Sequence, residues 1–356
     1  MTIVRKLNVM LVVGGDSSER DVSLGSGASV YQALRDLGHR VVVTDPLHPE
    51  IAPTEDPAVF FDNAGIRAEP PRLGREKYDA RKKFMTILGE FDLLGCDIVF
   101  NCLHGGAGED GTFQAVLDYF GIPYTGSGAA ASMLAMDKNL AKRIVAGERV
   151  PVAKQLFVEP DERNAADIEK RVRKTPALPA VVKPNREGSS VGVTIVRTVE
   201  ELASAIEEAT SYGGPYLIEE YIEGTEVTAS MLDGVELPLI EIRPKAGFYD
   251  YRNKYTSGAC EYIVPAPVDE KVADAVARSA RDAYRSLGCG GYARVDFRVK
   301  PQGDHYFLEV NTLPGMTSTS LVPKAAGAVG IGFPELVDRI LRLALPQDQT
   351  TLKGKR

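Results

Sequence analysis

The sequence has few cysteines and no long apolar run, and each shortage argues against a class of protein. Its four cysteines, Cys96, Cys102, Cys260 and Cys289, show no C-x-x-C spacing. They therefore indicate neither a zinc knuckle nor a disulfide framework, and we expect buried thiols in a reducing compartment. The apolar run within MTIVRKLNVMLVVGG is too short to span a bilayer, and no small-residue cleavage site follows it. We therefore expect a cytoplasmic protein without a membrane partner.

An excess of basic charge and a Walker P-loop are also missing. Lysine and arginine total 42 against 49 aspartates and glutamates, so the formal net charge is -7. Because nucleic-acid binding requires a basic face, we do not expect a nucleic acid as the main partner. Local basic sites for a small phosphate remain compatible with this charge. No segment matches G-x-x-x-x-G-K-[ST], so nucleotide phosphates would need a different loop.

The first part of the chain has the pattern of an open α/β sheet. A chain of 356 residues is too long for one simple core and predicts two or three domains. Strand-like runs at Asn8–Val13, Arg40–Thr44 and Asp97–Leu103 alternate with helical segments, the first of them from about Val22 to Leu37. Strand, glycine turn, helix and strand in this order predict a Rossmann-like α/β domain over residues 1-137.

From Lys138 onward the pattern changes to strands joined by loops of glycine and polar residues. The expected elements are the helix Lys138–Ala146, the strands Ala180–Lys183 and Val193–Val196, the helix Val199–Ser211, the strand Tyr216–Ile222, and the helices Glu270–Leu287 and Phe333–Leu345. Asp233-Gly234 is a strong signal for a type I′ hairpin turn. We expect two α+β domains here, at 138-225 and 226-356, and therefore a three-domain chain of mixed α/β and α+β class.

A predicted hairpin near the carboxy terminus brings acidic side chains together. Two β-patterned runs, Gly291–Lys300 and His305–Thr312, are joined by PQGD. A two-residue turn at Gln302-Gly303 would set Asp296 opposite Glu309 and Arg294 opposite Asn311, with all four side chains on one face. Opposed carboxylates repel unless a positive charge lies between them, and Asp, Glu and Asn supply the oxygen ligands that Mg²⁺ favours. A solvated polar face is the alternative, and a bulge would separate the carboxylates.

Two glycine-containing loops are candidates for phosphate binding. Lys183–Gly192, KPNREGSSVG, has small residues around two serines and a lysine at the end of a strand, so it is either a phosphate loop or an ordinary hairpin loop. Gly106–Gly111, GAGEDG, matches G-x-G-x-x-G literally. Its two acids would repel a pyrophosphate, which favours a tight turn over a dinucleotide site. Lys138, taken alone, predicts only a solvated helix face.

Several longer motifs occur in a fixed order: GGDSSERDVSLGSG (14–27), LHGGAGEDGTFQ, PYTGSGAAASMLAMDK, VVKPNREGSSVG, FYDYRNKY, ARVDF and LEVNTLPGMTSTSLVP (308–323). With these motifs the sequence resembles the D-alanine–D-alanine ligases of the ATP-grasp superfamily over nearly its whole length. The resemblance implies that ATP binds between the second and third domains. It also implies transfer of the γ-phosphate to one D-alanine, attack by the amine of a second, and loss of phosphate from a tetrahedral intermediate.

The resemblance also assigns roles to individual residues. It implies that Asp296, Glu309 and Asn311 bind two Mg²⁺ ions, with Mn²⁺ as a substitute. The residues implied at the nucleotide are Lys138, Lys183 and Lys254 on the phosphates, Glu219 and Ile222 at the adenine, and Glu226 at the ribose. Those implied at the substrates are Glu19, Ser189 and Tyr255 as a hydrogen-bonded set, His104 nearby, Arg294 and the Gly315 N–H at the oxyanion, and Ser320 with Leu321 at the second carboxylate. From the residues alone, a helix-capping acid is the favoured interpretation of Glu19 and a loop aromatic that of Tyr255, and the resemblance reverses both.

The remaining expectations concern specificity and assembly. Asn185, Glu220 and Thr319 depart from residues common in the family, which affects adenine affinity and the second substrate site rather than the core chemistry. Lys254-Tyr255 indicates an amine nucleophile, whereas a D-alanine–D-lactate ligase is the rival within the superfamily. A dinucleotide-dependent oxidoreductase built on GAGEDG and a catalytically dead nucleotide-binding module are more distant alternatives. The family implies a homodimer, and His39, His48 and His305 match no motif and are expected on the surface or in a hairpin.

Overall fold

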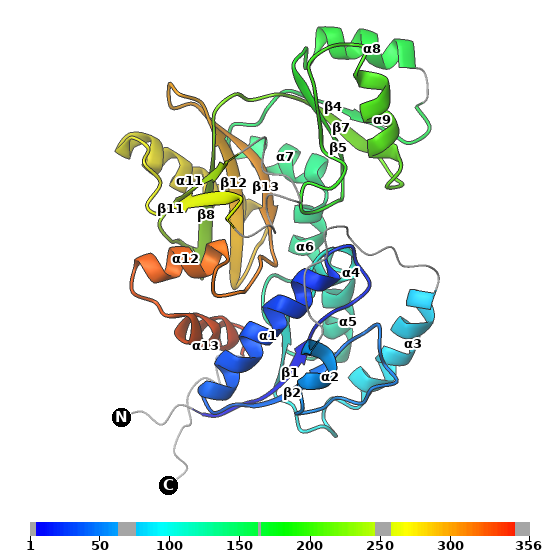
Figure 1. Cartoon of the computed structure of the whole chain (residues 1–356), viewed down its shortest axis with the longest axis vertical. Coiled ribbons are helices and arrows are strands. Elements are labelled where there is room, and N and C mark those ends of the chain that lie inside the picture. Colours follow the sequence, from blue (N-terminus) through cyan, green and yellow to red (C-terminus); the bar gives the residue numbers. More distant parts are fainter. Residues whose placement is uncertain (1–4, 63–75, 163–164, 246–257, 346–356) are drawn as a thin grey trace.

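The strands in the described part of the chain form three separate sheets (Figure 1). A computed structural model describes residues 5–62, 76–162, 165–245 and 258–345. The three sheets are made by strands from residues 8–101, 155–220 and 225–311 in turn. Within the described ranges, no helix is both long and apolar enough to cross a bilayer.

The first sheet is parallel and has helices on both faces. Its order is β2 (Arg40–Thr44), β1 (Asn8–Val12), β3 (Ile98–Asn101). Alternate residues of β1 enter two different cores, because Val9 packs with the core that contains α1 (Arg20–Asp36), whereas Met10 packs with the core on the other face. Burial on both faces explains why this strand is a continuous apolar run. The predicted strands and first helix are confirmed.

Further helices complete the first part of the chain. They are α2 (Ala58–Phe61), α3 (Glu76–Gly89), α4 (Gly106–Glu109), α5 (Thr112–Phe120) and α6 (Ala129–Met136). GAGEDG forms the short helix α4 and the left-handed residue Gly111 before α5, so the tight-turn prediction is confirmed.

The second sheet is antiparallel and carries two helices on one face. Its strand order is β4 (Gln155–Val158), β7 (Tyr216–Glu220), β5 (Ala180–Pro184), β6 (Thr194–Val196). The helices α8 (Ala165–Lys174) and α9 (Leu202–Thr210) pack over it around one apolar core, and α7 (Lys138–Gly147) precedes it. The segment KPNREGSSVG connects β5 to β6, which pair as an antiparallel hairpin.

The third sheet contains the predicted metal-binding strands. Its order is β11 (Cys260–Ile263), β10 (Ile240–Pro244), β8 (Thr225–Leu232), β12 (Tyr292–Val299), β13 (His305–Asn311), with β9 (Val235–Glu236) paired to β8. The helix α11 (Glu270–Ser286) packs against it. Asp233 and Gly234 have φ of 52° and 73°, so both central residues of the β8–β9 turn are left-handed, as a type I′ turn requires.

The register of the β12–β13 hairpin is confirmed, but its predicted turn is wrong. Asp296 pairs with Glu309 and Arg294 with Asn311. However, the last paired residues are Val299 and His305, so the connection is longer than two residues. The pairing shifts between Asp296 and Phe297, which leaves Leu308 as the extra residue of a bulge. The longer turn and the bulge offset each other in register. Arg294, Asp296, Glu309 and Asn311 all lie beyond the bulge, on the side away from the turn, so their predicted pairing is unchanged.

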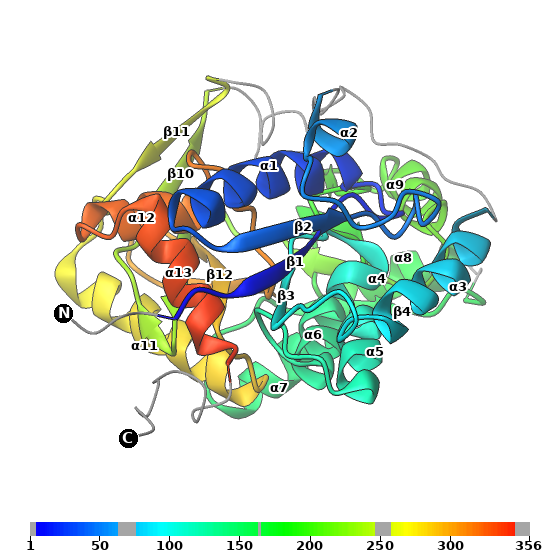
Figure 2. The same ribbon diagram turned by 90° about the horizontal axis from the view of Figure 1, so that it is seen from below.

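The last two helices return to the first part of the chain. The helix α13 (Phe333–Leu343) lies beside α1 in two perpendicular views (Figures 1 and 2), and α12 (Leu321–Ala328) packs against α13. Both helices share the core that contains α1 and β1. His39 is buried at this contact and accepts the Leu7 N–H, with its Nε2 3.4 Å from Asp338 Oδ1. The expectation of a surface position for His39 is therefore wrong, because α13 covers it.

The predictions for the other histidines and for the cysteines are only partly confirmed. His48 is partly buried, with its side chain 44% exposed, and His305 is half-buried in the β12–β13 hairpin, so a surface position and a hairpin position are as expected. All four cysteines are free thiols, but only Cys96 and Cys102 are buried. Cys260 and Cys289 are half-buried, so the expectation of burial is wrong for these two.

Candidate active site

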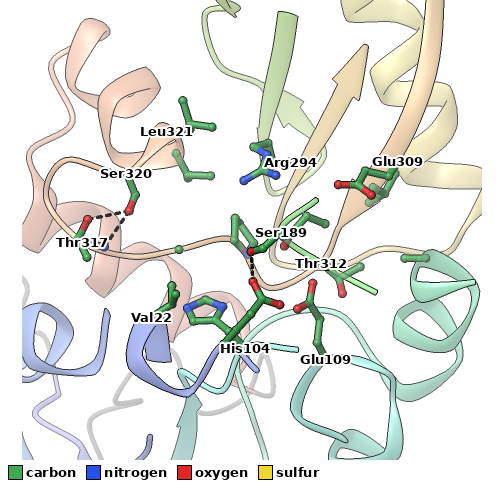
Figure 3. A pocket seen from close by; sticks show the side chains of 18 of the residues that line it. Val22, His104, Glu109, Ser189, Arg294, Glu309, Thr312, Thr317, Ser320 and Leu321 are labelled. Atoms are coloured by element: carbon green, nitrogen blue, oxygen red, sulfur yellow. Dashed lines mark hydrogen bonds between the residues drawn. The ribbon is translucent and has the colours of Figure 1, made fainter. Parts of the chain in front are cut away.

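A large cavity lies where all three sheets approach one another. Its volume is about 540 Å³. The residues predicted from sequence that line it are Glu19, Lys138, Ser189, His104, Arg294, Glu309, Asn311, Gly315, Ser320 and Leu321. Figure 3 shows His104 and Glu109 on one side of this cavity and Arg294 and Glu309 on the other. We call it the substrate cavity after the sequence predictions for the residues that line it.

Glu19 lies at the start of α1 and joins two parts of the chain that are distant in sequence. Its carboxylate accepts a hydrogen bond from the Ser189 hydroxyl. Ser189 has a left-handed φ of 48°, which is uncommon for a serine and places strain in the β5–β6 loop. A Cβ on Gly188 would lie 2.6 Å from Glu19 Oε2, so the loop approaches the carboxylate as closely as a glycine allows. Glu19 makes no side-chain capping bond to α1, so the capping alternative is wrong.

His104 fixes the loop that contains Gly315. Its Nε2 is 3.0 Å from Ser26 Oγ, and Ser26 Oγ accepts the Met316 N–H at 3.1 Å. Burial lowers the pKa of His104, with a smaller opposing effect from Glu19 and a backbone hydrogen bond to Leu313. The imidazole is therefore neutral at pH 7. Through its hydrogen bonds to Ser26 and to the Leu313 backbone, the neutral ring holds the segment 313–316 against α1.

Each carboxylate of the predicted metal site has its own cation. Arg294 donates to Asp296 with Nη2 2.8 Å from Oδ2, and the Thr228 hydroxyl donates to Asp296 Oδ1 at 2.6 Å. Lys138 Nζ is 3.3 Å from Glu309 Oε2 and donates to the Glu187 carbonyl at 2.6 Å. Lys138 is buried rather than on a solvated helix face, because β13 and the β5–β6 loop cover it.

The donor set at this site fits a hard divalent cation. Asp296, Glu309 and Asn311 offer only oxygen ligands, which Mg²⁺ favours over zinc. The described residues contain no group of three or more His, Cys, Asp or Glu side chains placed to hold a metal. Two carboxylates and an amide on one face therefore form an incomplete shell, as expected where waters or phosphate oxygens supply the other ligands.

Ser320 and Leu321 begin α12 at the edge of the substrate cavity. Ser320 Oγ accepts the Thr317 N–H at 3.1 Å and is 2.7 Å from Thr317 Oγ1. A Cβ on Gly315 would be 3.3 Å from Ser320 Oγ, so this loop passes close to the hydroxyl. The first backbone N–H groups of a helix are unpaired within it and favour anions.

Glu109 is a buried acid of the substrate cavity that was not assigned from sequence. Its Oε2 accepts the N–H of Gly105, the residue just before GAGEDG, at 2.9 Å. Burial raises the pKa of Glu109 to about 8, and the nearby Glu19 adds to the effect. The carboxyl is therefore protonated at neutral pH. Glu109 also occupies the Gly105 N–H, so this backbone donor is not available to the pyrophosphate of a dinucleotide.

A second cavity lies between the second and third sheets and opens beside Glu309. Its volume is about 160 Å³, and we call it the nucleotide cavity after the sequence prediction for the residues that line it. Lining it are five residues predicted at the nucleotide: Lys138, Lys183, Glu219, Ile222 and Glu226. Apolar side chains, among them Val181, Ile195 and Leu308, line the same space. Apolar walls with a few charged groups suit a flat base bearing phosphates.

Glu219 is held by two lysines, one of which was not assigned from sequence. Its Oε1 is 2.6 Å from Lys142 Nζ, and its Oε2 is 2.9 Å from Lys183 Nζ. Burial alone would raise the pKa of Glu219, but these two lysines together lower it to about 2. Lys142 follows Lys138 by four residues on α7, and this spacing was the only sequence signal for it.

Lys254 and Tyr255 lie outside the described residues. Their predicted roles therefore remain predictions.

Comparison with known proteins identifies the family of this chain. A family model described as D-ala D-ala ligase N-terminus matches residues 8–127, and one described as D-ala D-ala ligase C-terminus matches residues 144–342. A D-alanine–D-alanine ligase of Anaeromyxobacter sp. (strain Fw109-5) is 43% identical over 334 residues, covering 94% of this chain and 95% of the relative.

Solved structures give the same result. The D-alanine–D-alanine ligase of Bacillus anthracis in complex with ATP is 31% identical, with a TM-score of 0.72 over 95% of this chain and 97% of that one. The VanG D-Ala:D-Ser ligase of Enterococcus faecalis is 27% identical, with a TM-score of 0.76 over 96% of this chain and 100% of that one. The architecture is therefore the three-domain ATP-grasp fold that the sequence predicted. This chain belongs to the D-alanine–D-alanine ligase family.

Proposed function

We propose that this chain joins two D-alanine molecules into D-alanyl-D-alanine while converting ATP to ADP and phosphate. The observation that carries the proposal is that Lys138 and Glu309 line both cavities. A nucleotide in the smaller cavity would therefore present its terminal phosphate to a carboxylate in the larger one. A carbon–nitrogen ligase that proceeds through an acyl phosphate requires this juxtaposition.

The first substrate would bind between α1 and the β5–β6 loop. Glu19 would hold its ammonium group, and Ser189 would orient Glu19 through the hydrogen bond between them. His104 lies close by and keeps the facing loop in place. Tyr255 would complete the set with Glu19 and Ser189. The carboxylate of this D-alanine would then take the γ-phosphoryl group of ATP to give an acyl phosphate.

The second substrate would bind beside α12. The Ser320 hydroxyl and the Leu321 N–H would hold its carboxylate at the helix start. Its amine would attack the acyl phosphate, and the Arg294 guanidinium and the Gly315 N–H would stabilise the tetrahedral oxyanion. Phosphate would leave when this intermediate collapses to the dipeptide.

The nucleotide and its metal would be held by the residues between the two cavities. Lys138, Lys183 and Lys254 would neutralise the phosphates, Glu219 and Ile222 would contact the adenine, and Glu226 the ribose. Asp296, Glu309 and Asn311 would hold two Mg²⁺ ions, with Mn²⁺ as a substitute. Mg²⁺ bound there would neutralise charge on the phosphate oxygens.

We also propose the domain boundaries 1-137, 138-225 and 226-356, a cytoplasmic location and a homodimer. The product would be a peptidoglycan precursor, so a bacterial cell that builds a wall is the implied setting. The substrates are small molecules, and no nucleic acid or membrane takes part.

Phosphate release from ATP tests the reaction. Purified protein with Mg²⁺ and D-alanine alone should release phosphate and form D-alanyl-D-alanine. Separate reactions containing D-lactate or D-serine beside D-alanine define the second substrate. Product formation only with D-lactate or D-serine would replace the proposed specificity, and no D-alanine-dependent phosphate release in any reaction would refute the ligase activity.

A further inference from the structure

Lys142 is a buried cation that lies behind the nucleotide cavity rather than on its wall. Its side chain is only 1% exposed, and its Nζ is 2.6 Å from Glu219 Oε1. Lys183 and Glu219 line the nucleotide cavity, whereas Lys142 does not. A nucleotide in that cavity could therefore contact Lys183 and Glu219 directly, but it would contact Lys142 only through Glu219.

Glu219 has more positive charge around it than its own neutralisation requires. The Lys183 ammonium is 2.9 Å from Glu219 Oε2, on the opposite oxygen from Lys142. All three side chains are less than one-tenth exposed. A single buried ion pair would satisfy one carboxylate, so one of the two lysines is available for another anion.

The proposed nucleotide binding gives that role to Lys183. Its ammonium must turn from Glu219 toward a phosphate, and a buried carboxylate left with no cation is strongly unfavourable. Without another partner, Glu219 would either retain Lys183 or take up a proton. A protonated Glu219 would also lose its character as a pure hydrogen-bond acceptor.

We propose that Lys142 is a positioning residue, the permanent counter-ion of Glu219 that allows Lys183 to bind nucleotide phosphate while Glu219 stays ionised. This inference rests on the proposed ATP binding. An ionised Glu219 facing the base accepts from an amino group and cannot donate to a carbonyl. The site would therefore favour adenine over hypoxanthine, the base that carries a carbonyl oxygen at the same position.

The charges around Lys142 predict that the affinity for ATP depends on pH. Burial lowers the pKa of Lys142 to about 8. Glu219 on β7 and Glu309 on β13 oppose this effect, whereas Lys183 on β5 adds to it. As pH rises through about 8, Lys142 loses its charge, and ATP affinity should fall in the wild type. With arginine at this position the charge persists, so this part of the fall should disappear.

The test measures ATP binding by titration calorimetry with Mg²⁺ and no D-alanine. Lys142→Met should raise the Kd for ATP by about tenfold or more, since one partner of a buried pair is removed. The KM for D-alanine should change by less than about twofold, because the variant leaves the binding of D-alanine itself unchanged. Lys142→Arg should recover most of the ATP affinity. Arg143→Met is the matched control, since Arg143 is the exposed neighbour on α7, and it should bind ATP as the wild type does.

A double variant separates this role from direct phosphate binding and from a purely structural role. Lys142→Met with Glu219→Gln removes both charges and should bind ATP more tightly than Lys142→Met alone. It should also discriminate less between ATP and inosine triphosphate than the wild type, because an amide can also donate. If the double variant binds no better than Lys142→Met, the charge of Lys142 does not act through Glu219 and the proposal is wrong. The double variant still gives a result if Lys142→Met does not fold, because its comparison with the wild type shows whether ATP affinity survives loss of both charges.

Unchanged ATP affinity in folded Lys142→Met would also overturn the proposal. The binding assay contains no D-alanine, so it is independent of the ligase reaction. A wild-type protein that binds ATP but releases no phosphate with D-alanine would refute the proposed function and leave the role of Lys142 to be decided by the variants.

Discussion

Asp296 and Glu309 are paired across the β12–β13 hairpin, yet each carboxylate contacts a different cation, Arg294 for Asp296 and Lys138 for Glu309. The two cations come from separate elements, β12 and α7. Opposed acids of this kind repel each other, and the two cations offset that repulsion. Loss of the Glu309 charge would remove the repulsion together with the Lys138 contact, so we expect Glu309 to matter more for the reaction than for stability.

Glu309→Gln should therefore lower kcat by roughly 100-fold while leaving thermal unfolding nearly unchanged, because an electrostatic contact at the reacting phosphate is lost. The measurements are phosphate release at saturating D-alanine over a range of Mg²⁺ concentrations, and the unfolding midpoint. Glu207→Gln, at an exposed position of α9, is the matched control. If Glu309→Gln kept the wild-type kcat, Glu309 would not be a ligand of the proposed metal site.

Glu109 should make the protein less stable as pH rises through the neutral range. Its pKa in the folded protein is about 8, chiefly because the group is buried, whereas in the unfolded chain it is near the ordinary value of 4.5. Between these values the folded state holds a proton that the unfolded state has lost. The free energy of unfolding therefore falls as pH rises, by at most about 1.4 kcal/mol per pH unit from this group.

Glu109→Gln keeps a carbonyl oxygen for the Gly105 N–H and cannot ionise. Chemical unfolding at pH 5 to pH 8, measured in half-unit steps, should show a shallower pH dependence for this variant than for the wild type. The advantage of the variant should be greatest at the upper end of this range. Parallel curves for the two proteins would mean that Glu109 already ionises at low pH in the folded state.

Local features of the fold were predictable because their determinants are local in the sequence. Turn chemistry predicts the Asp233-Gly234 turn. The apolar run of β1 and the two-residue period of a strand predict β1 itself and the face that Asp296 shares with Glu309. The bulge at Leu308 was not predictable, because it depends on how β13 packs rather than on its own residues. The hairpin register was correct only because this bulge offset an incorrect turn length.

Features that depend on distant segments escaped prediction. Along the sequence of α7, Lys142 has the pattern of any surface lysine, but in the fold it is buried and paired with Glu219 on the distant strand β7. Glu109 was interpreted as a helix-start acid, and its raised pKa arises from burial by other elements. His39 is covered by a helix that begins almost 300 residues later in the chain. The contact of Glu19 with Ser189 was expected only through family resemblance, since no local pattern links the two.

A side chain at Gly188 should disturb the position of Glu19, because the β5–β6 loop approaches its carboxylate there. A Cβ at this position would be 2.6 Å from Glu19 Oε2, so Gly188→Ala must displace the carboxylate or the loop. We expect kcat/KM for D-alanine to fall by about 100-fold, as for other displacements of a positioning group by about 1 Å. Gly327→Ala on α12 is the control, since a Cβ there meets nothing within 4 Å. Steady-state kinetics should show wild-type behaviour for Gly327→Ala, and equal loss in both variants would argue against a specific clash.

Asp338 on α13 should stabilise the contact between the last helix and the first sheet in a pH-dependent way. Burial raises its pKa, but His39 and Arg342 together lower it to about 2, below the ordinary value of 3.8. The unfolded chain therefore takes up a proton before the folded protein does, and the stabilisation is full above pH 4 and lost as pH falls toward 2. By linkage the contribution is roughly 2 kcal/mol.

Asp338→Asn should lower the free energy of unfolding by about this amount at pH 7 and by much less near pH 2 to 3, measured by urea unfolding. Asp282→Asn, at an exposed position of α11, should have little effect at either pH. A loss in Asp338→Asn that is the same at both pH values would show that the carboxylate acts through packing rather than through its charge.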